Sequence, residues 1–88
     1  MIEKNVKIIN NAGLHTRPAA TIVKIAAKYK SDFYINKDGL SINGKSIIGV
    51  MTLAAAKGSD LVLTFEGEDE HEIAEDILSY FNRGFDEL

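Results

Sequence analysis

Apolar and polar side chains alternate along four stretches of the chain, which is the pattern of β-strands that bury one face. These stretches are residues 2–9, 32–36, 40–42 and 60–66. The last is the clearest, because Leu61, Leu63 and Phe65 all point to the same face. Between the second and third stretches, Asp38 and Gly39 form a typical hairpin turn signal. The pattern therefore predicts four strands, two of them joined by a tight turn.

Apolar residues three and four positions apart indicate three helices that each bury one side. We expect these helices over residues 16–29 and 47–56 and between Asp69 and Gly84. The predicted buried stripe of the first helix consists of Ala19, Ile22, Val23 and Ala26. The element order is then β-α-β-β-α-β-α. This order predicts an α+β fold, a four-stranded antiparallel sheet with three helices on one face.

Residues with known capping preferences lie at the predicted helix ends. Ser46 is expected to cap the second helix, because its hydroxyl can accept a hydrogen bond from a free N–H of the first turn. Gly58 is expected to close that helix. Asp69 and Glu72 are spaced as a capping pair for the last helix, and Gly84 is placed as its C-cap.

Composition narrows the class of protein. The chain has 88 residues, of which 45% are hydrophobic and 26% charged, and we expect residues 1–88 to form one domain. It has no cysteine and a net charge of −3, which excludes disulfides and argues against non-specific nucleic-acid binding. No apolar run approaches the roughly 18 residues of a membrane span. We therefore expect a cytoplasmic protein, without membrane insertion and monomeric.

Charge is distributed unevenly along the chain. Residues 12–30 carry four basic side chains and no acidic one, whereas residues 66–88 carry nine acidic side chains and only Arg83 as a fixed positive charge. The basic residues Arg17, Lys24 and Lys28 lie on one stripe of the first helix, which could steer an acidic partner. The alternative interpretation is an ordinary solvated helix face.

The start of the first predicted helix carries the candidate chemistry. His15 lies just ahead of this helix, Arg17 follows two residues later, and Pro18 suits a first helical turn. Free N–H groups of that turn and the guanidinium fork both favour a phosphate group. His15 is thus a nucleophilic nitrogen beside an anion site. His71, in contrast, lies among acidic residues and is expected to have no special role.

The second predicted helix is apolar nearly all the way round. A helix in a domain of this size cannot bury every side, so we expect Ile47, Ile48 and Met51 to be partly exposed. Such a patch typically docks a partner, and methionine adapts easily to different partners.

Two segments of the chain resemble the active-site and regulatory signatures of the HPr family, the histidine-containing phosphocarriers of the bacterial phosphotransferase system. They are GLHTRPA at residues 13–19 and NGKSIIGVM at residues 43–51. The resemblance implies an open-faced β-sandwich with sheet order 1-4-2-3. It also implies phosphorylation of His15 on Nδ1, with Arg17 and the backbone of Thr16 and Arg17 stabilising the phosphate, and regulatory phosphorylation of Ser46.

The family further implies partners and a docking face. The partners are an upstream phosphoenolpyruvate-dependent phosphotransferase, sugar-permease components, a serine kinase/phosphorylase and a transcription regulator. The implied docking residues are Thr16, Lys24, Ile47, Ile48 and Met51. Neither a metal nor a cofactor is implied, and the protein would be a substrate of enzymes rather than an enzyme itself.

The sequence departs from the family pattern at two positions and leaves two other functions open. Ala12 replaces a polar residue that can bond to the His15 ring, and Ala54 replaces a frequent glycine. One alternative is a regulatory adaptor that binds through the Ile47/Ile48/Met51 face. The other is a carrier of the nitrogen-related branch of the same system, without coupling to sugar uptake.

Overall fold

The computed structural model describes all 88 residues. Its elements, in chain order, are β1 (Ile2–Lys7), α1 (Thr16–Ala26), β2 (Asp32–Lys37), β3 (Leu40–Asn43), α2 (Ile47–Thr52), β4 (Asp60–Glu66), α3 (Glu70–Asn82) and a short turn (Gly84–Asp86). The predicted element order is therefore confirmed.

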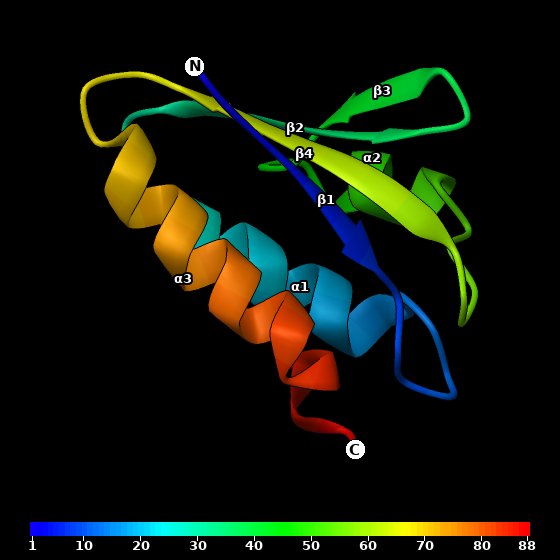
Figure 1. Cartoon of the computed structure of the whole chain (residues 1–88). Helices are drawn as coiled ribbons and strands as arrows, with labels where there is room; N and C mark the ends of the chain where they lie inside the picture. The colour runs from blue at the N-terminus through cyan, green and yellow to red at the C-terminus, as the bar shows by residue number, and fades with distance from the viewer.

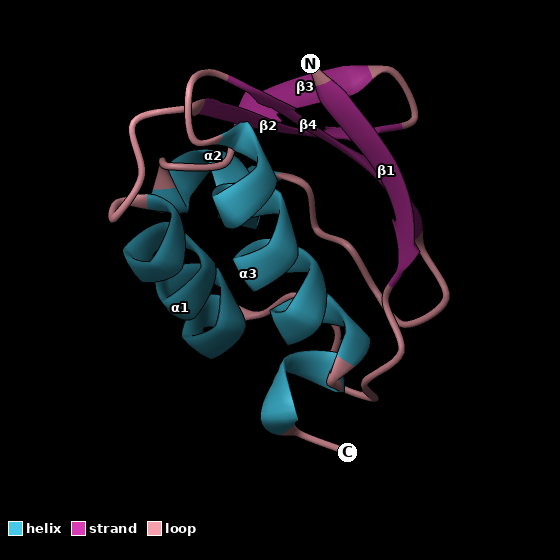
Figure 2. Ribbon diagram, turned by 60° about the vertical axis from the view of Figure 1, so that its left-hand side comes forward, coloured by secondary structure: helices cyan, strands magenta, loops and turns pink.

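The four strands form a single antiparallel sheet in the order β1-β4-β2-β3. All three helices lie on one face of this sheet, and the other face is uncovered (Figures 1 and 2). This arrangement confirms the expected α+β fold and the open-faced sandwich. No helix has both the length and the apolar character needed to cross a bilayer.

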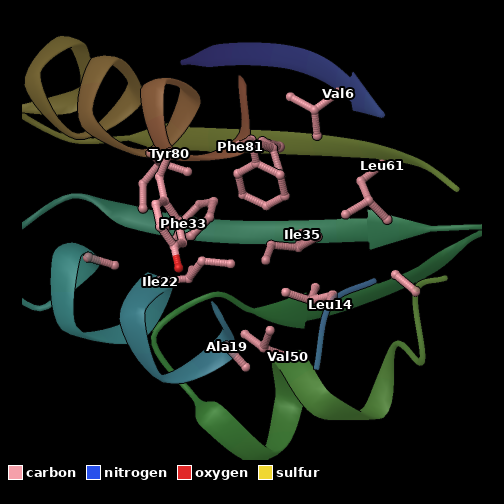
Figure 3. Close-up of a cluster of buried hydrophobic side chains, with 14 of the residues drawn as sticks. Val6, Leu14, Ala19, Ile22, Phe33, Ile35, Val50, Leu61, Tyr80 and Phe81 are labelled. Atoms are coloured by element: carbon pink, nitrogen blue, oxygen red, sulfur yellow. The ribbon is translucent and has the colours of Figure 1, made fainter. Parts of the chain in front are cut away.

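The core lies between the sheet and the helices (Figure 3). Phe33 of β2 and Phe65 of β4 are fully buried, and their rings stack with centroids 4.8 Å apart. Ile22 of α1 and Phe81 of α3 pack into the same layer. Burying a side chain of this size contributes about 1.5–3 kcal/mol, so this layer fixes the helices on the sheet. Val23, predicted to face the core, is only partly buried against it.

Helix α1 ends at Ala26, three residues before the predicted end. Beyond it, the N–H groups of Lys30 and Ser31 both donate to the Asp69 carboxylate, at 2.9 Å each. The helix has ended before these residues, because the N–H groups of Lys28 and Tyr29 already bond three residues back. Asp69 then holds the loop that follows. The predicted Asp69–Glu72 capping pair is consequently wrong, because Asp69 makes no side-chain cap on α3. The Glu70 carboxylate instead accepts the N–H of Gly67, at 3.1 Å.

Helix α2 is also shorter than predicted and ends at Thr52 rather than at residue 56. The N–H groups of Leu53 and Ala54 bond three residues back, which tightens the last turn. Ala54 then adopts a left-handed conformation with φ +48° and turns the chain away. Gly58 does not close the helix; its N–H bonds to Ile8 O, 2.7 Å away, in the approach to β4.

The strand boundaries differ from the predictions by one or two residues. β1 ends at Lys7 instead of residue 9, because the N–H of Ile8 bonds to Ser59 outside the β4 ladder. β2 and β3 each extend one residue beyond the predicted end, to Lys37 and Asn43. At the end of α3 the C-cap is Arg83, one residue before the predicted position, and Gly84 follows it in the left-handed conformation with φ +62°.

The conformation of Ala54 generates a prediction. A left-handed residue other than glycine destabilises the folded state by roughly 1–2 kcal/mol, and glycine would remove this strain. Glycine also makes the unfolded chain more flexible, which reduces the gain in stability by about 0.4–1 kcal/mol. We expect Ala54→Gly to raise the free energy of unfolding by about 0.5–1 kcal/mol, as measured by urea titration. Ala56→Gly is the control, because Ala56 is not left-handed and should lose stability. A loss of stability in Ala54→Gly would show that Ala54 is not strained.

Candidate functional site

The loop before α1 is fixed by backbone contacts to the segment after α2. The N–H of Leu14 bonds to Ala55 O at 2.8 Å, and the Leu14 side chain is buried. Gly13 has φ +72°, and a Cβ there would lie 2.7 Å from Ala55 O. Only glycine fits so close to this carbonyl. The loop thereby delivers His15 to the start of α1 in one defined position.

His15 occupies the N-cap position of α1, as predicted, with φ −90° and ψ −172°. Its side chain does not cap the helix and remains 35% exposed at the surface. The N–H groups of Thr16 and Arg17 have no hydrogen-bond partner in the protein, and Pro18 has no N–H. The helix start next to the ring therefore has two free donors and the positive end of the helix dipole.

One nitrogen of the His15 ring is already bound. Nε2 lies 2.6 Å from Oε2 of Glu87, and Nδ1 has no hydrogen-bond partner in the protein. The other carboxylate oxygen of Glu87 accepts the side-chain amide of Asn10 at 2.8 Å. These bonds join the first loop, the start of α1 and the chain end after α3.

The surroundings of Glu87 favour its charged form. The hydrogen bond from Asn10, followed by that from His15 and the nearby charge of Arg17, lowers the pKa of Glu87 below its ordinary value of 4.5. Glu87 is thus an anion at neutral pH and accepts from His15, so the ring proton resides on Nε2. Nδ1 then carries the lone pair and has the chemistry of a nucleophile.

Two of the three basic residues predicted for this stripe lie at the surface without acidic partners, whereas Lys28 Nζ lies 3.8 Å from the Asp76 carboxylate. Arg17 and Lys24 are exposed and form no ion pair. Thr16 is exposed beside them. The structure thus brings Arg17 to the same helix end as His15, with its guanidinium free to meet an anion. It does not hold Arg17 against the ring.

Ser46 caps α2 as predicted. Its hydroxyl accepts the N–H of Gly49 at 3.1 Å. The backbone is close-packed here: a Cβ on Gly49 would lie 3.3 Å from Asn43 O and 3.4 Å from the Ser46 side chain. Beyond the cap, the predicted apolar patch is exposed, with Ile47 at 40%, Ile48 at 77% and Met51 at 39%. Helices α1 and α2 contact each other, so this patch and the basic residues lie on adjoining helices.

Two residues of the site were missed by the sequence interpretation. Asn10 lies between the first predicted strand and the first predicted helix, yet it is fully buried, and Glu87 is one of the nine acidic side chains of residues 66–88. No local pattern could have identified them, since Glu87 lies 72 positions from His15. Ala12 has no polar side-chain atom to bond to the ring, and the carboxylate of Glu87 contacts it at Nε2. His71 is exposed and makes no side-chain hydrogen bond.

One protein family matches the part of the chain that forms the sheet and the three helices. The family described as "PTS HPr component phosphorylation site" matches residues 2–83. The phosphocarrier protein HPr of Treponema pallidum is 42% identical over 87 residues, which cover 99% of each chain. The HPr-like protein Crh of Bacillus subtilis is 40% identical over 80 residues, covering 91% of this chain and 94% of Crh.

Solved structures agree with the fold. HPr-C-His from Thermoanaerobacter tengcongensis has a TM-score of 0.95 at 38% identity, covering 100% of this chain and 99% of its own. A crystal structure of Crh from Bacillus subtilis has a TM-score of 0.76 at 38% identity, covering 96% and 97% of the two chains. That Crh structure is described as a dimer with a swapping domain.

Proposed function

The chain belongs to the HPr family of phosphocarrier proteins of the phosphotransferase system, and we propose that its phosphoacceptor is His15. In this proposal a phosphoenolpyruvate-dependent phosphotransferase donates the phosphoryl group, sugar-permease components receive it, and the transfer takes place in the cytoplasm. The observation that carries the assignment is the engaged Nε2 of His15, which leaves Nδ1 as the free nitrogen beside two unpaired N–H groups.

The site can both accept the phosphoryl group and hold it. The lone pair on Nδ1 attacks phosphorus while the bond from phosphorus to the donor breaks. The resulting phosphate oxygens would lie near the N–H groups of Thr16 and Arg17, where the helix dipole favours negative charge. The Arg17 guanidinium can then bind two phosphate oxygens at once. The chemistry needs no metal or cofactor on this chain, which is a carrier rather than an enzyme.

We propose that partners dock on the adjoining surfaces of α1 and α2. Thr16 and Lys24 supply a polar and a basic contact, and the exposed patch supplies the apolar centre that protein interfaces typically have. The patch consists of Ile47, Ile48 and Met51. A partner with an apolar surface ringed by acidic residues fits this combination, because the basic helix would steer it to His15.

Ser46 is proposed as a regulatory phosphorylation site for a serine kinase/phosphorylase. Its hydroxyl already binds the first turn of α2, and a phosphate there would remain near free N–H groups. The same negative charge would lie beside Ile47 and Ile48, where it would repel an acidic partner. Regulation through Ser46 would therefore change partner choice without unfolding the domain.

A regulatory adaptor is the second candidate function. It is supported by two relatives named HPr-like protein Crh, which are 41% and 40% identical to this chain. The description of a Crh structure from Bacillus subtilis names catabolite repression. In that role the α2 patch would bind a transcription regulator. A carrier of the nitrogen-related branch, in contrast, would use the same His15.

The expectation of a monomer stays a prediction, because related structures are described as dimers. Sedimentation of the purified protein would test it.

The first functional prediction concerns the phosphorylation site. We expect His15→Ala to abolish phosphoenolpyruvate-dependent labelling, because the nucleophilic nitrogen is lost, and the wild-type label to be acid-labile. The measurement is radiolabel incorporation with the upstream phosphotransferase, followed by mass spectrometry of the labelled peptide. His71→Ala is the control and should label normally. Label that survives in His15→Ala would refute the carrier proposal.

Arg17 is tested by a change that keeps its charge. Arg17→Lys loses the planar fork, so we expect transfer from His15 to slow about tenfold while the melting temperature stays the same. Rates are measured by single-turnover transfer between purified proteins. Lys30→Gln removes a charge from the loop that follows α1 and serves as the control. Equal transfer rates in Arg17→Lys and the wild type would exclude Arg17 from the site.

Ser46 has a separate test. Ser46→Asp places a negative charge next to the apolar patch, so we expect the rate of His15 phosphorylation to fall while the melting temperature changes little. Ser46→Ala loses about 1 kcal/mol of capping energy but should be phosphorylated at the wild-type rate. If Ser46→Asp leaves the rate unchanged, Ser46 is only a helix cap.

A further inference from the structure

We propose that Glu87 is a positioning residue that holds the neutral His15 ring with its proton on Nε2 and its lone pair on Nδ1. This inference rests on the proposed function of His15 as phosphoacceptor, and it adds a residue that the HPr resemblance did not supply. It follows from a chain of directed hydrogen bonds that runs from a backbone carbonyl to the ring.

The direction of each bond in this chain is fixed. The side-chain nitrogen of Asn10 donates one hydrogen to Gly13 O at 2.9 Å and the other to Glu87 Oε1 at 2.8 Å. Both partners of this amide are acceptors, so it cannot be reversed without setting oxygen against oxygen. The second oxygen of Glu87 faces His15 Nε2 at 2.6 Å. The acceptor end of Glu87 is therefore presented to the ring.

This arrangement includes two features that destabilise the folded state, an unpaired buried oxygen and a left-handed backbone turn. Asn10 is fully buried, and its Oδ1 has no hydrogen-bond partner in the protein. Gly84, Phe85 and Asp86 are all left-handed, with φ of 62°, 58° and 59°. Each of the two that is not glycine costs roughly 1–2 kcal/mol. Backbone strain and unpaired buried groups of this kind typically accumulate at functional sites.

Aromatic packing holds the strained turn and so determines where Glu87 lies. The Phe85 ring is buried with its centroid 5.2 Å from that of Tyr80 and 5.0 Å from that of Phe81. Arg83 bonds to the Asp86 carboxylate at 2.7 Å on the outer side of the turn. Together these contacts return the chain toward α1, where the Glu87 side chain is only 19% exposed.

The position of Glu87 also suits the transfer step. When Nδ1 forms its bond to phosphorus and the bond to a phosphorylated protein donor breaks, the proton on Nε2 stays in place. The ring then carries a positive charge, which the carboxylate faces directly. A hydrogen bond between a charged ring and a charged carboxylate is stronger than one between neutral groups. Partial burial of the carboxylate strengthens it further.

Replacing Glu87 by glutamine tests this mechanism with a change of one atom. Because the NH₂ group of Asn10 faces this position, the glutamine oxygen should turn to Asn10 and its NH₂ group should face His15 Nε2. The ring would then accept at Nε2 and carry its proton on Nδ1, which removes the nucleophilic lone pair. We expect Glu87→Gln to slow His15 phosphorylation by more than about tenfold, since a wrong tautomer disables a histidine even in intact geometry.

Glu87→Ala distinguishes positioning from simple packing. Alanine removes the contact and leaves the ring free to sample both tautomers, so we expect only a few-fold decrease in rate. A merely structural role would make the isosteric glutamine the milder change. Glu75→Gln, on the exposed side of α3, is the matched control and should behave as the wild type. The ¹⁵N chemical shifts of the ring, measured by NMR where the ring is neutral, report the tautomer without any phosphotransferase.

The two readouts separate this inference from the proposed function. An unprotonated Nδ1 in the wild type and a protonated Nδ1 in Glu87→Gln support the positioning role, even if His15 proves not to be labelled. An unprotonated Nδ1 in Glu87→Gln overturns it, and so does a rate in Glu87→Gln that is no lower than in Glu87→Ala.

Discussion

The structure depends on the burial of one apolar layer between the sheet and the helices. The stacked rings of Phe33 and Phe65 lie at the centre of this layer, and Ile22 and Phe81 bring α1 and α3 against it. Because all three helices cover the same face, their ends are brought together along one surface of the molecule (Figure 2). The contact between His15 and Glu87 depends on this packing, since it joins the start of α1 to the chain that follows α3.

Residues that depend on neighbours in the sequence could be predicted well. The strands follow from alternation, Ser46 was identified as a cap from its type, and the exposure of Ile47 and Ile48 follows from a helix too apolar to bury. His15 and Arg17 were found because the anion site at a helix start is a local property. The resemblance to the HPr family then supplied the roles that spacing alone could not.

Contacts between distant positions account for the errors. Asp69 holds the loop that follows α1, and its carboxylate lies 38 and 39 positions further along the chain than the N–H groups it binds. The bond between Asn10 and Glu87 spans 77 positions. Acidic residues near a chain end are usually solvated, and nothing in the local pattern separates Glu87 from its neighbours. Only the left-handed turn at Gly84, Phe85 and Asp86 brings that carboxylate to the ring.

The placement of the two chain ends has a practical consequence for handling the protein. The amino group of Met1 lies 3.3 Å from Glu70 at the start of α3, whereas Leu88 directly follows the residue that contacts His15. The two termini thus lie at opposite ends of the molecule (Figure 1). A purification tag, fluorescent fusion or surface tether attached after Leu88 would be joined directly to the segment that contacts the His15 ring. The same attachment before Met1 would leave that segment undisturbed.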